Sequence, residues 1–174
     1  MENENKIFTL PRKVLPIITV ALAVLLVVVV WFLSRDKAPD SSAPAEVQEL
    51  VVESVTPQGS DVVVATTYGT VKYPYAFSDI MSVEAKNFGS YAALEFSAKI
   101  GEKSYKLYDL LFNSEEGSPL GTLEYNGETY TVTAQFHGVS NIDDNHAVTF
   151  YAAQETLNDV ASSLAENENF TAEN

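Results

Sequence analysis

The chain has 174 residues, no cysteine and a formal net charge of −14. Without cysteine it has no disulfide, no thiolate metal site, no cysteine nucleophile and no lipidated cysteine anchor. The charge is unevenly divided: residues 1–37 carry five Lys or Arg and three Asp or Glu, whereas residues 38–174 carry five Lys and 21 Asp or Glu. This acidic excess argues against nucleic acid as a partner.

An uncharged apolar run lies near the N-terminus. Val14–Leu33 reads VLPIITVALAVLLVVVVWFL, and twenty helical residues span about 30 Å, the thickness of a bilayer core. The run predicts a transmembrane helix over residues 14–34, in contact with the lipid bilayer, after a short tail of residues 1–13. A cleaved signal peptide is the alternative. The apolar run of a signal peptide is shorter than this one, and in this chain the charged residues Arg35, Asp36 and Lys37 follow almost at once.

The positive charges around this span predict its orientation. Three Lys or Arg precede it, two follow it, and none occurs between Ala38 and Val71. Because the more basic side stays in the cytoplasm, we expect a cytoplasmic N-terminus and a C-terminal domain outside the cell membrane.

A spacer and one folded domain follow. Residues 35–46, which include APDSSAPA, are typical of an extended Ser/Ala/Pro linker. Residues 47–164 are long enough to bury a core, and we expect them to form one extracytoplasmic domain. The last ten residues, 165–174, are polar and predict a disordered acidic tail.

In the first two thirds of this domain, apolar and polar residues alternate with a period of two. In Tyr91–Ile100 the apolar residues fall on one face, and Gly101-Glu102 predicts a hairpin to Ser104–Phe112. The apolar residues of this strand change from odd to even positions near Leu107, which predicts a bulge or burial on both faces. Asn126-Gly127 predicts a type I′ turn between two further strands. Residues 46–55 fit either a helical face or the start of a strand, and Pro57–Ser60 predicts a break in the chain.

The period changes to that of a helix after His137. Phe150, Ala153, Leu157 and Val160 lie on one helical stripe, and Asp143 or Asp144 offers an N-cap. We therefore expect an α+β fold: an antiparallel sheet of about five to seven strands, packed by a C-terminal helix.

The sequence contains no recognisable catalytic or metal-binding motif, so we expect no catalytic residue, metal or cofactor. It has no HExxH, GxSxG, phosphate-binding or GxGxxG pattern. His137 and His146, its two histidines, are expected at the surface or at a helix end. The carboxylate pairs Glu115-Glu116 and Asp143-Asp144 are typical of solvated loops or a helix start.

Two weaker signals have competing interpretations. The oxygen-rich run that contains Asn141, Asp143, Asp144 and Asn145 lacks the EF-hand register, although it has donors for weak calcium binding. Asn169-Phe170-Thr171 fits the N-glycosylation pattern, which matters only in a eukaryotic secretory pathway.

Four aromatic residues lie close together around Gly69 and Pro74. Exposed rings there would form a ligand-contact surface for a peptide or a sugar, whereas buried rings would pack beneath the sheet. The four candidates are Tyr68, Tyr73, Tyr75 and Phe77.

Two segments carry a resemblance. TTYGTVKYPYAFSD at Thr66–Asp79 and YAAQETLNDV at Tyr151–Val160 resemble an uncharacterised family of small membrane-anchored or exported proteins of Gram-positive anaerobes related to clostridia. The resemblance implies an extracytoplasmic domain and supplies no activity, cofactor or catalytic residue.

These patterns predict a single-pass, non-enzymatic binding or accessory module of the cell envelope, with a protein, peptide or glycan partner. One alternative is an envelope hydrolase that uses carboxylates or a serine. The other is a sensor, which would signal through a partner because the 13 residues before the span are too few for a folded domain.

Overall fold

The computed structural model describes residues 47–140 and 142–173. The predicted tail, transmembrane helix and linker, residues 1–46, lie outside these residues. Within the described part, no helix is long and apolar enough to cross a bilayer.

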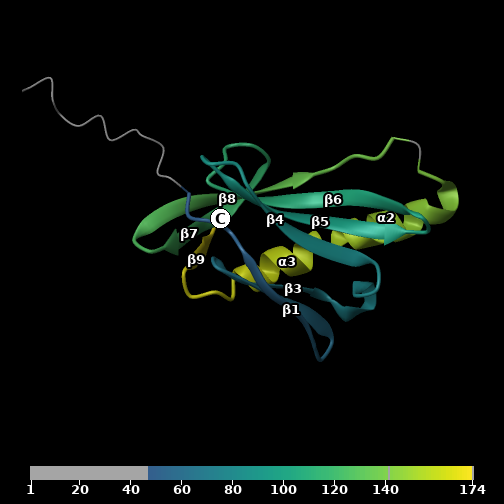
Figure 1. Ribbon diagram of the computed structural model, residues 1–174, viewed down its shortest axis with the longest axis horizontal. Coiled ribbons are helices and arrows are strands. Elements are labelled where there is room, and N and C mark those ends of the chain that lie inside the picture. The colour runs from purple at the N-terminus through teal and green to yellow at the C-terminus, as the bar shows by residue number, and fades with distance from the viewer. Residues whose placement is uncertain (1–46, 141, 174) are drawn as a thin grey trace, which may run out of the picture. The chain divides into compact units, whose positions relative to one another are not determined.

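The described residues form two antiparallel sheets and two consecutive helices (Figure 1). The smaller sheet has the order β1-β2-β3 and the larger the order β4-β5-β6-β8-β7-β9. The strands are β1 (Val52–Gln58), β2 (Asp61–Thr66), β3 (Gly69–Pro74), β4 (Met81–Asn87), β5 (Ala92–Ile100), β6 (Lys103–Phe112), β7 (Ser118–Tyr125), β8 (Glu128–Phe136) and β9 (Phe170–Ala172). The helices are the single 3₁₀ turn η1 (Tyr75–Phe77), α2 (Asp144–Glu155) and α3 (Leu157–Leu164).

The predicted α+β class is confirmed, but the strand count and the single sheet are not. Nine strands are divided between two sheets because the chain leaves the first sheet at Pro74, turns through η1 and begins β4 in the second. A proline lacks the N–H needed to continue a ladder, which favours this exit. The C-terminal helix is divided at Thr156 into α2 and α3.

Several local predictions are confirmed. Asn126 and Gly127 both have positive φ, at 51° and 83°, and join β7 to β8. Gly101 has φ 64° in the β5–β6 hairpin, and the register of that pair shifts at Leu107, as a bulge requires. Asp143 caps α2 by accepting a hydrogen bond from the backbone N–H of Asn145.

The predicted disordered tail is wrong for three of its residues. Phe170–Ala172 form β9, which pairs antiparallel with β7 at Gly121–Leu123. The Phe170 ring packs against the core, and Gly121 has no Cβ that would overlap the carbonyl oxygen of Thr171. A polar stretch is thus ordered by one aromatic anchor and one close backbone approach.

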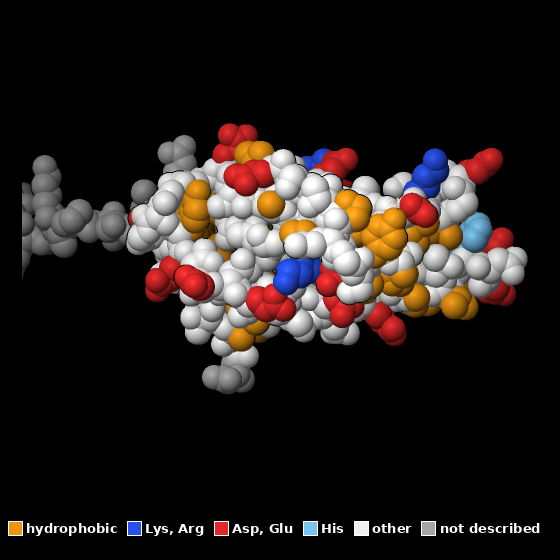
Figure 2. Space-filling model, turned by 90° about the horizontal axis from the view of Figure 1, so that it is seen from below, with side chains coloured by type: hydrophobic (Ala, Val, Ile, Leu, Met, Phe, Trp, Pro, Cys, Tyr) orange, Lys and Arg blue, Asp and Glu red, His pale blue; other side chains and the backbone are white. Residues whose placement is uncertain are grey.

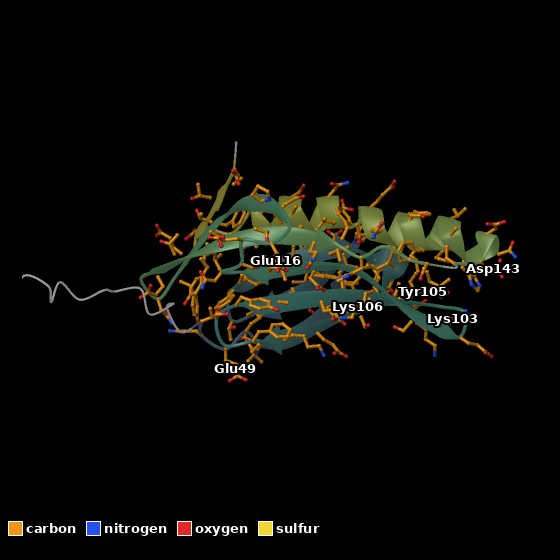
Figure 3. All side chains as sticks on the ribbon, turned by 90° about the horizontal axis from the view of Figure 1, so that it is seen from above. Glu49, Lys103, Tyr105, Lys106, Glu116 and Asp143 are labelled. Atoms are coloured by element: carbon orange, nitrogen blue, oxygen red, sulfur yellow. The ribbon has the colours of Figure 1, made fainter. Side chains whose placement is uncertain are left out.

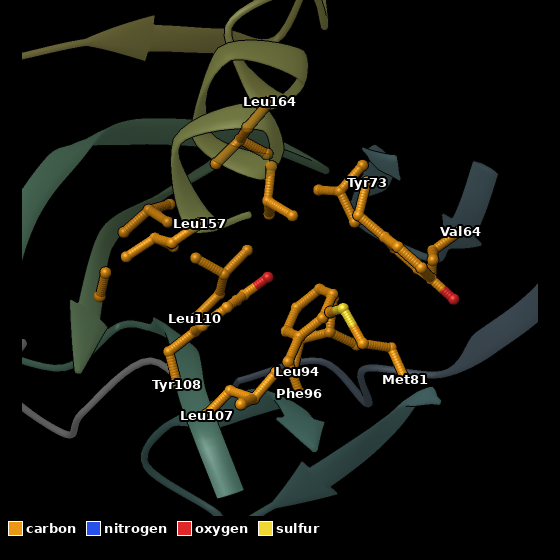
Figure 4. Packing of buried hydrophobic residues seen from close by; sticks show 14 of the residues in the cluster. Val64, Tyr73, Met81, Leu94, Phe96, Leu107, Tyr108, Leu110, Leu157 and Leu164 are labelled. Atoms are coloured by element: carbon orange, nitrogen blue, oxygen red, sulfur yellow. The ribbon is translucent and has the colours of Figure 1, made fainter. Parts of the chain in front are cut away.

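The core lies between the larger sheet, the helices and the smaller sheet (Figure 4). Leu157 and Leu164 of α3 contribute to it together with Leu94 and Leu110 of the larger sheet and Tyr73 of the smaller one. Helix α2 packs on β5 and β6, and α3 packs against β3. The opposite face of the larger sheet, called the outer face below, is turned away from this core.

Two asparagine side chains extend the sheets where backbone pairing stops. Asn87 accepts from Leu50 N–H and donates to Leu50 C=O, each at 2.9 Å. Asn167 accepts from Thr70 N–H at 3.0 Å and donates to Thr70 C=O at 2.8 Å, while Ser163 Oγ accepts from Lys72 N–H at 2.7 Å. The second set covers the free edge of β3 with side chains from α3 and the turn after it, which prevents edge-to-edge pairing there.

Candidate functional site

The four aromatic candidates do not form one surface. Tyr68 and Tyr73 are each 2% exposed, whereas Tyr75 is 48% exposed and Phe77 packs partly against the core. The Tyr68 ring contacts Phe112, Tyr125 and Tyr130, and its hydroxyl donates to the Gln48 carbonyl at 2.5 Å. Burial raises the pKa of both Tyr68 and Tyr73. Both are core residues and do not form a ligand surface with Tyr75.

The two predicted carboxylate pairs lie far apart. Asp143 caps α2 and Asp144 lies in its first turn. In Figure 3, Asp143 lies at the end of the domain that carries Lys103, well away from Glu116. Because glycoside hydrolysis needs two carboxylates across one cleft, these pairs do not combine into such a site. Asn141 of the calcium candidate lies outside the described residues.

The histidines have different surroundings. His146 lies in the first turn of α2, and its ring lies beside Gly101 in the β5–β6 turn. His137 Nε2 lies 2.9 Å from Asp109 Oδ2, and the other Asp109 carboxylate oxygen is buried without a hydrogen-bond partner among the described residues. No hydrogen bond in the described part joins the His137 ring to a serine, so the pair lacks the third member of a nucleophilic triad.

Asp109 is a residue that sequence reasoning missed. It faces outward from β6 between Glu95 of β5 and Gln135 of β8, and it is only 9% exposed. A carboxylate inside the apolar run LYDLLF was the available signal, because charged residues rarely occupy such positions without a partner. In the described part, no group of three or more His, Asp or Glu residues could hold a metal ion.

Within the part of the chain that the structure describes, a groove lies on the outer face of β7 and β8. Its volume is about 480 Å³, within the range of small-molecule sites. The lining residues come from the β6–β7 loop, from β7 and β8, and from β9 with the residue after it: Ser114, Glu115, Gly117, Pro119, Gly121, Thr122, Thr131, Val132, Thr133, Thr171, Ala172 and Glu173. We call this feature the threonine groove.

Threonines form the floor of the threonine groove. Thr171, Thr122 and Thr131 are directly opposite one another on β9, β7 and β8, so their side chains share the outer face. Cross-strand threonines are well suited to a pleated surface. Together with Pro119 and Ala172 they give a lining that is mainly apolar, with hydroxyl groups at intervals.

The loop wall of the threonine groove is held by two hydrogen bonds. Thr131 Oγ1 donates to the Ser114 carbonyl at 3.2 Å, and Thr133 Oγ1 donates to the Glu116 carbonyl. Gly117, with φ 88°, passes so close to the Ala134 carbonyl that a Cβ would overlap it. The glycine and both threonines therefore fix the loop over β8 and keep the groove preformed.

No protein-family model, curated protein or solved structure matches this chain. The resemblance to envelope proteins of Gram-positive anaerobes therefore stays a prediction, and the threonine groove is interpreted from its own chemistry.

Proposed function

We propose that this chain is a single-pass, membrane-anchored module that binds a partner outside the cell membrane in the threonine groove. The observation that carries the proposal is the preformed groove itself: an open, mainly apolar concavity whose polar groups converge from three separate segments. Binding sites typically combine apolar walls with a few placed polar groups in this way.

The anchoring part of the proposal rests on residues 14–34 and on the charge bias around them. A tethered module needs no large interface for useful occupancy, because confinement at a surface raises the effective concentration of its partner. The described side chains that line the groove offer hydroxyl and carboxylate groups, which can hydrogen-bond a bound partner.

Filling the groove tests the binding role. Thr122→Trp places an indole on the groove floor, and we expect the full chain in nanodiscs to lose at least about tenfold in affinity for peptides selected from a random phage-displayed library. Ser82→Trp is the matched control, because it adds the same ring to β4 at the other edge of the same sheet. Selected peptides that bind wild type and both variants equally would refute the groove as the binding site.

The location has a separate test. Protease added to intact cells that express the full chain should remove residues 47–173, because we place them outside the membrane. A protected fragment that contains these residues would overturn the orientation and leave the binding result unaffected.

A further inference from the structure

We propose that the ligand of the threonine groove is a basic peptide segment whose lysine or arginine side chain lies between Glu115 and Glu173. This inference rests on the proposed binding function and deepens it by naming the class of partner. Two observations carry it: the acidic lining and the distribution of lysines over the described domain.

The charged side chains among the described lining residues are Glu115 and Glu173, and both are acidic. Glu115 belongs to the loop over β8, and Glu173 follows β9, so the two come from opposite walls. Both are exposed, and each carboxylate can accept a hydrogen bond from an ammonium or guanidinium group.

Two of the hydroxyl groups that line the threonine groove are left only as acceptors. The hydroxyl hydrogens of Thr131 and Thr133 are engaged with the Ser114 and Glu116 carbonyls, so their oxygens are left as acceptors. Pro119 has no backbone N–H to donate. Together with the carboxylates of Glu115 and Glu173, these acceptors favour a ligand with cationic N–H donors, and the same carboxylates would repel a phosphate or carboxylate ligand.

The lysines of the described domain do not oppose this assignment. None of the five lines the groove, and three form ion pairs: Lys72 with Glu166, Lys86 with Glu84 and Lys106 with Glu95. Lys103 lies at the end of the domain remote from Glu116 (Figure 3). Acidic side chains are scattered widely over the face shown in Figure 2, where basic ones are few.

A peptide fits this groove better than a glycan does. Sugar rings commonly stack on aromatic side chains, and no aromatic residue occurs among the described lining residues. The net negative field of the domain would also attract a basic segment and raise its association rate at low salt.

The test uses the full chain in nanodiscs of phosphatidylcholine, which carry no net charge, with empty nanodiscs as blanks. The probe is an acetylated, amidated peptide of alternating lysine and valine, and calorimetry compares it with the same peptide carrying glutamine in place of lysine. We expect the lysine peptide to bind at least about tenfold more tightly, with affinity that falls as the ionic strength rises toward about 1 M.

Charge removal locates the contact. Glu115→Gln and Glu173→Gln should each weaken the lysine peptide by about twofold to fivefold, as expected for exposed ion pairs. Glu102→Gln, in the β5–β6 turn, removes the same charge at the other end of the domain and should leave the affinity nearly unchanged. Thr122→Trp should abolish binding of the lysine peptide.

The other outcomes separate this inference from the function on which it rests. Equal binding of the lysine and glutamine peptides, lost in Thr122→Trp, would overturn the basic ligand and keep the groove as a peptide site. Binding of soluble wall-glycan fragments in the groove, with no binding of the lysine peptide, would overturn the basic ligand and keep the groove as a glycan site. Lysine-peptide binding that Glu102→Gln weakens as much as the two groove variants would show diffuse charge attraction and overturn the inference.

Discussion

Asn167 offers the sharpest test of how α3 secures the smaller sheet. Its side-chain amide makes a reciprocal pair of hydrogen bonds with Thr70 of β3, and it also donates to the Leu164 carbonyl at 2.9 Å. The backbone groups of Thr70 would otherwise have no partner on that edge of the smaller sheet, because β3 is its last strand. Asn167→Ala removes the whole pair without adding bulk.

The expected loss of stability in Asn167→Ala follows from the hydrogen bonds that it removes. A buried or half-buried hydrogen bond contributes about 0.5–1.5 kcal/mol net, so the two bonds with Thr70 predict a loss of about 1–3 kcal/mol in the free energy of unfolding. Loss of the contact with Leu164, at the end of α3, places the estimate in the upper half of that range. Asn169→Ala is the matched control, because Asn169 makes one exposed bond, to the Glu124 carbonyl, and should cost about 0.5 kcal/mol.

Two measurements check this prediction on the full chain in detergent micelles. Urea unfolding followed by the near-ultraviolet dichroism of the tyrosines gives the free-energy change. Hydrogen exchange should show faster exchange in Gly69–Pro74 of β3, with little change in β6 and β8. Unchanged exchange in β3 together with an unchanged midpoint would refute the view that the amide substitutes for a missing strand.

Three further predictions concern the sheet edge, the core and the pH response. Gly121→Ala should displace β9, because the new Cβ would overlap the Thr171 carbonyl. Hydrogen exchange of residues 170–172 should then rise to the rate of an unstructured peptide, and continued protection of these residues would contradict the prediction. Leu110→Ala removes a fully buried side chain and should cost about 2–5 kcal/mol in urea unfolding, whereas a loss below about 1 kcal/mol would show that the site collapses. Burial raises the folded-state pKa of three tyrosines, so their stabilising effect is complete below the unfolded pKa of about 10 and is lost as the pH rises above it. These three residues are Tyr68, Tyr73 and Tyr108. Their phenolate absorbance should appear only with alkaline unfolding, and its appearance in the folded state would refute their burial.

Local features of the fold were predictable because they depend on neighbouring residues. Alternation in β5, the positive φ angles of Asn126-Gly127 and the cap at Asp143 each rest on a short stretch of chain. The bulge at Leu107 was predictable for the same reason, since a change of parity is visible within one strand.

The division into two sheets and the presence of β9 depend on distant partners. Asn87 and Asn167 act on residues 37 and 97 positions away, and nothing in their local sequence distinguishes them from asparagines of a turn. β9 is ordered by a glycine in another strand and by one phenylalanine, whereas its own composition is that of a polar tail.

The candidate site was missed because its chemistry has no motif. The threonine groove is assembled from residues 114–122, 131–133 and 171–173, and its members are small residues of kinds that occur throughout the chain. The aromatic residues drew attention instead, because a cluster of tyrosines is visible in the sequence, although Tyr68 and Tyr73 prove to be core. In the sequence, the groove corresponds only to outward-facing threonines on adjacent strands.

Hydrogen bonds from two segments hold the first described residues of the domain. β1 is an exposed edge strand, and an edge strand at the start of a domain would fray under load. The chain is instead held just before β1, where Leu50 is 1% exposed and its backbone is bonded on both sides to Asn87. Tyr68 holds the Gln48 carbonyl, and Thr67 Oγ1 donates to the Glu49 carbonyl at 3.1 Å. If the chain is anchored in a membrane as proposed, a pull from the anchor would reach the larger sheet through Asn87 before it reached β1.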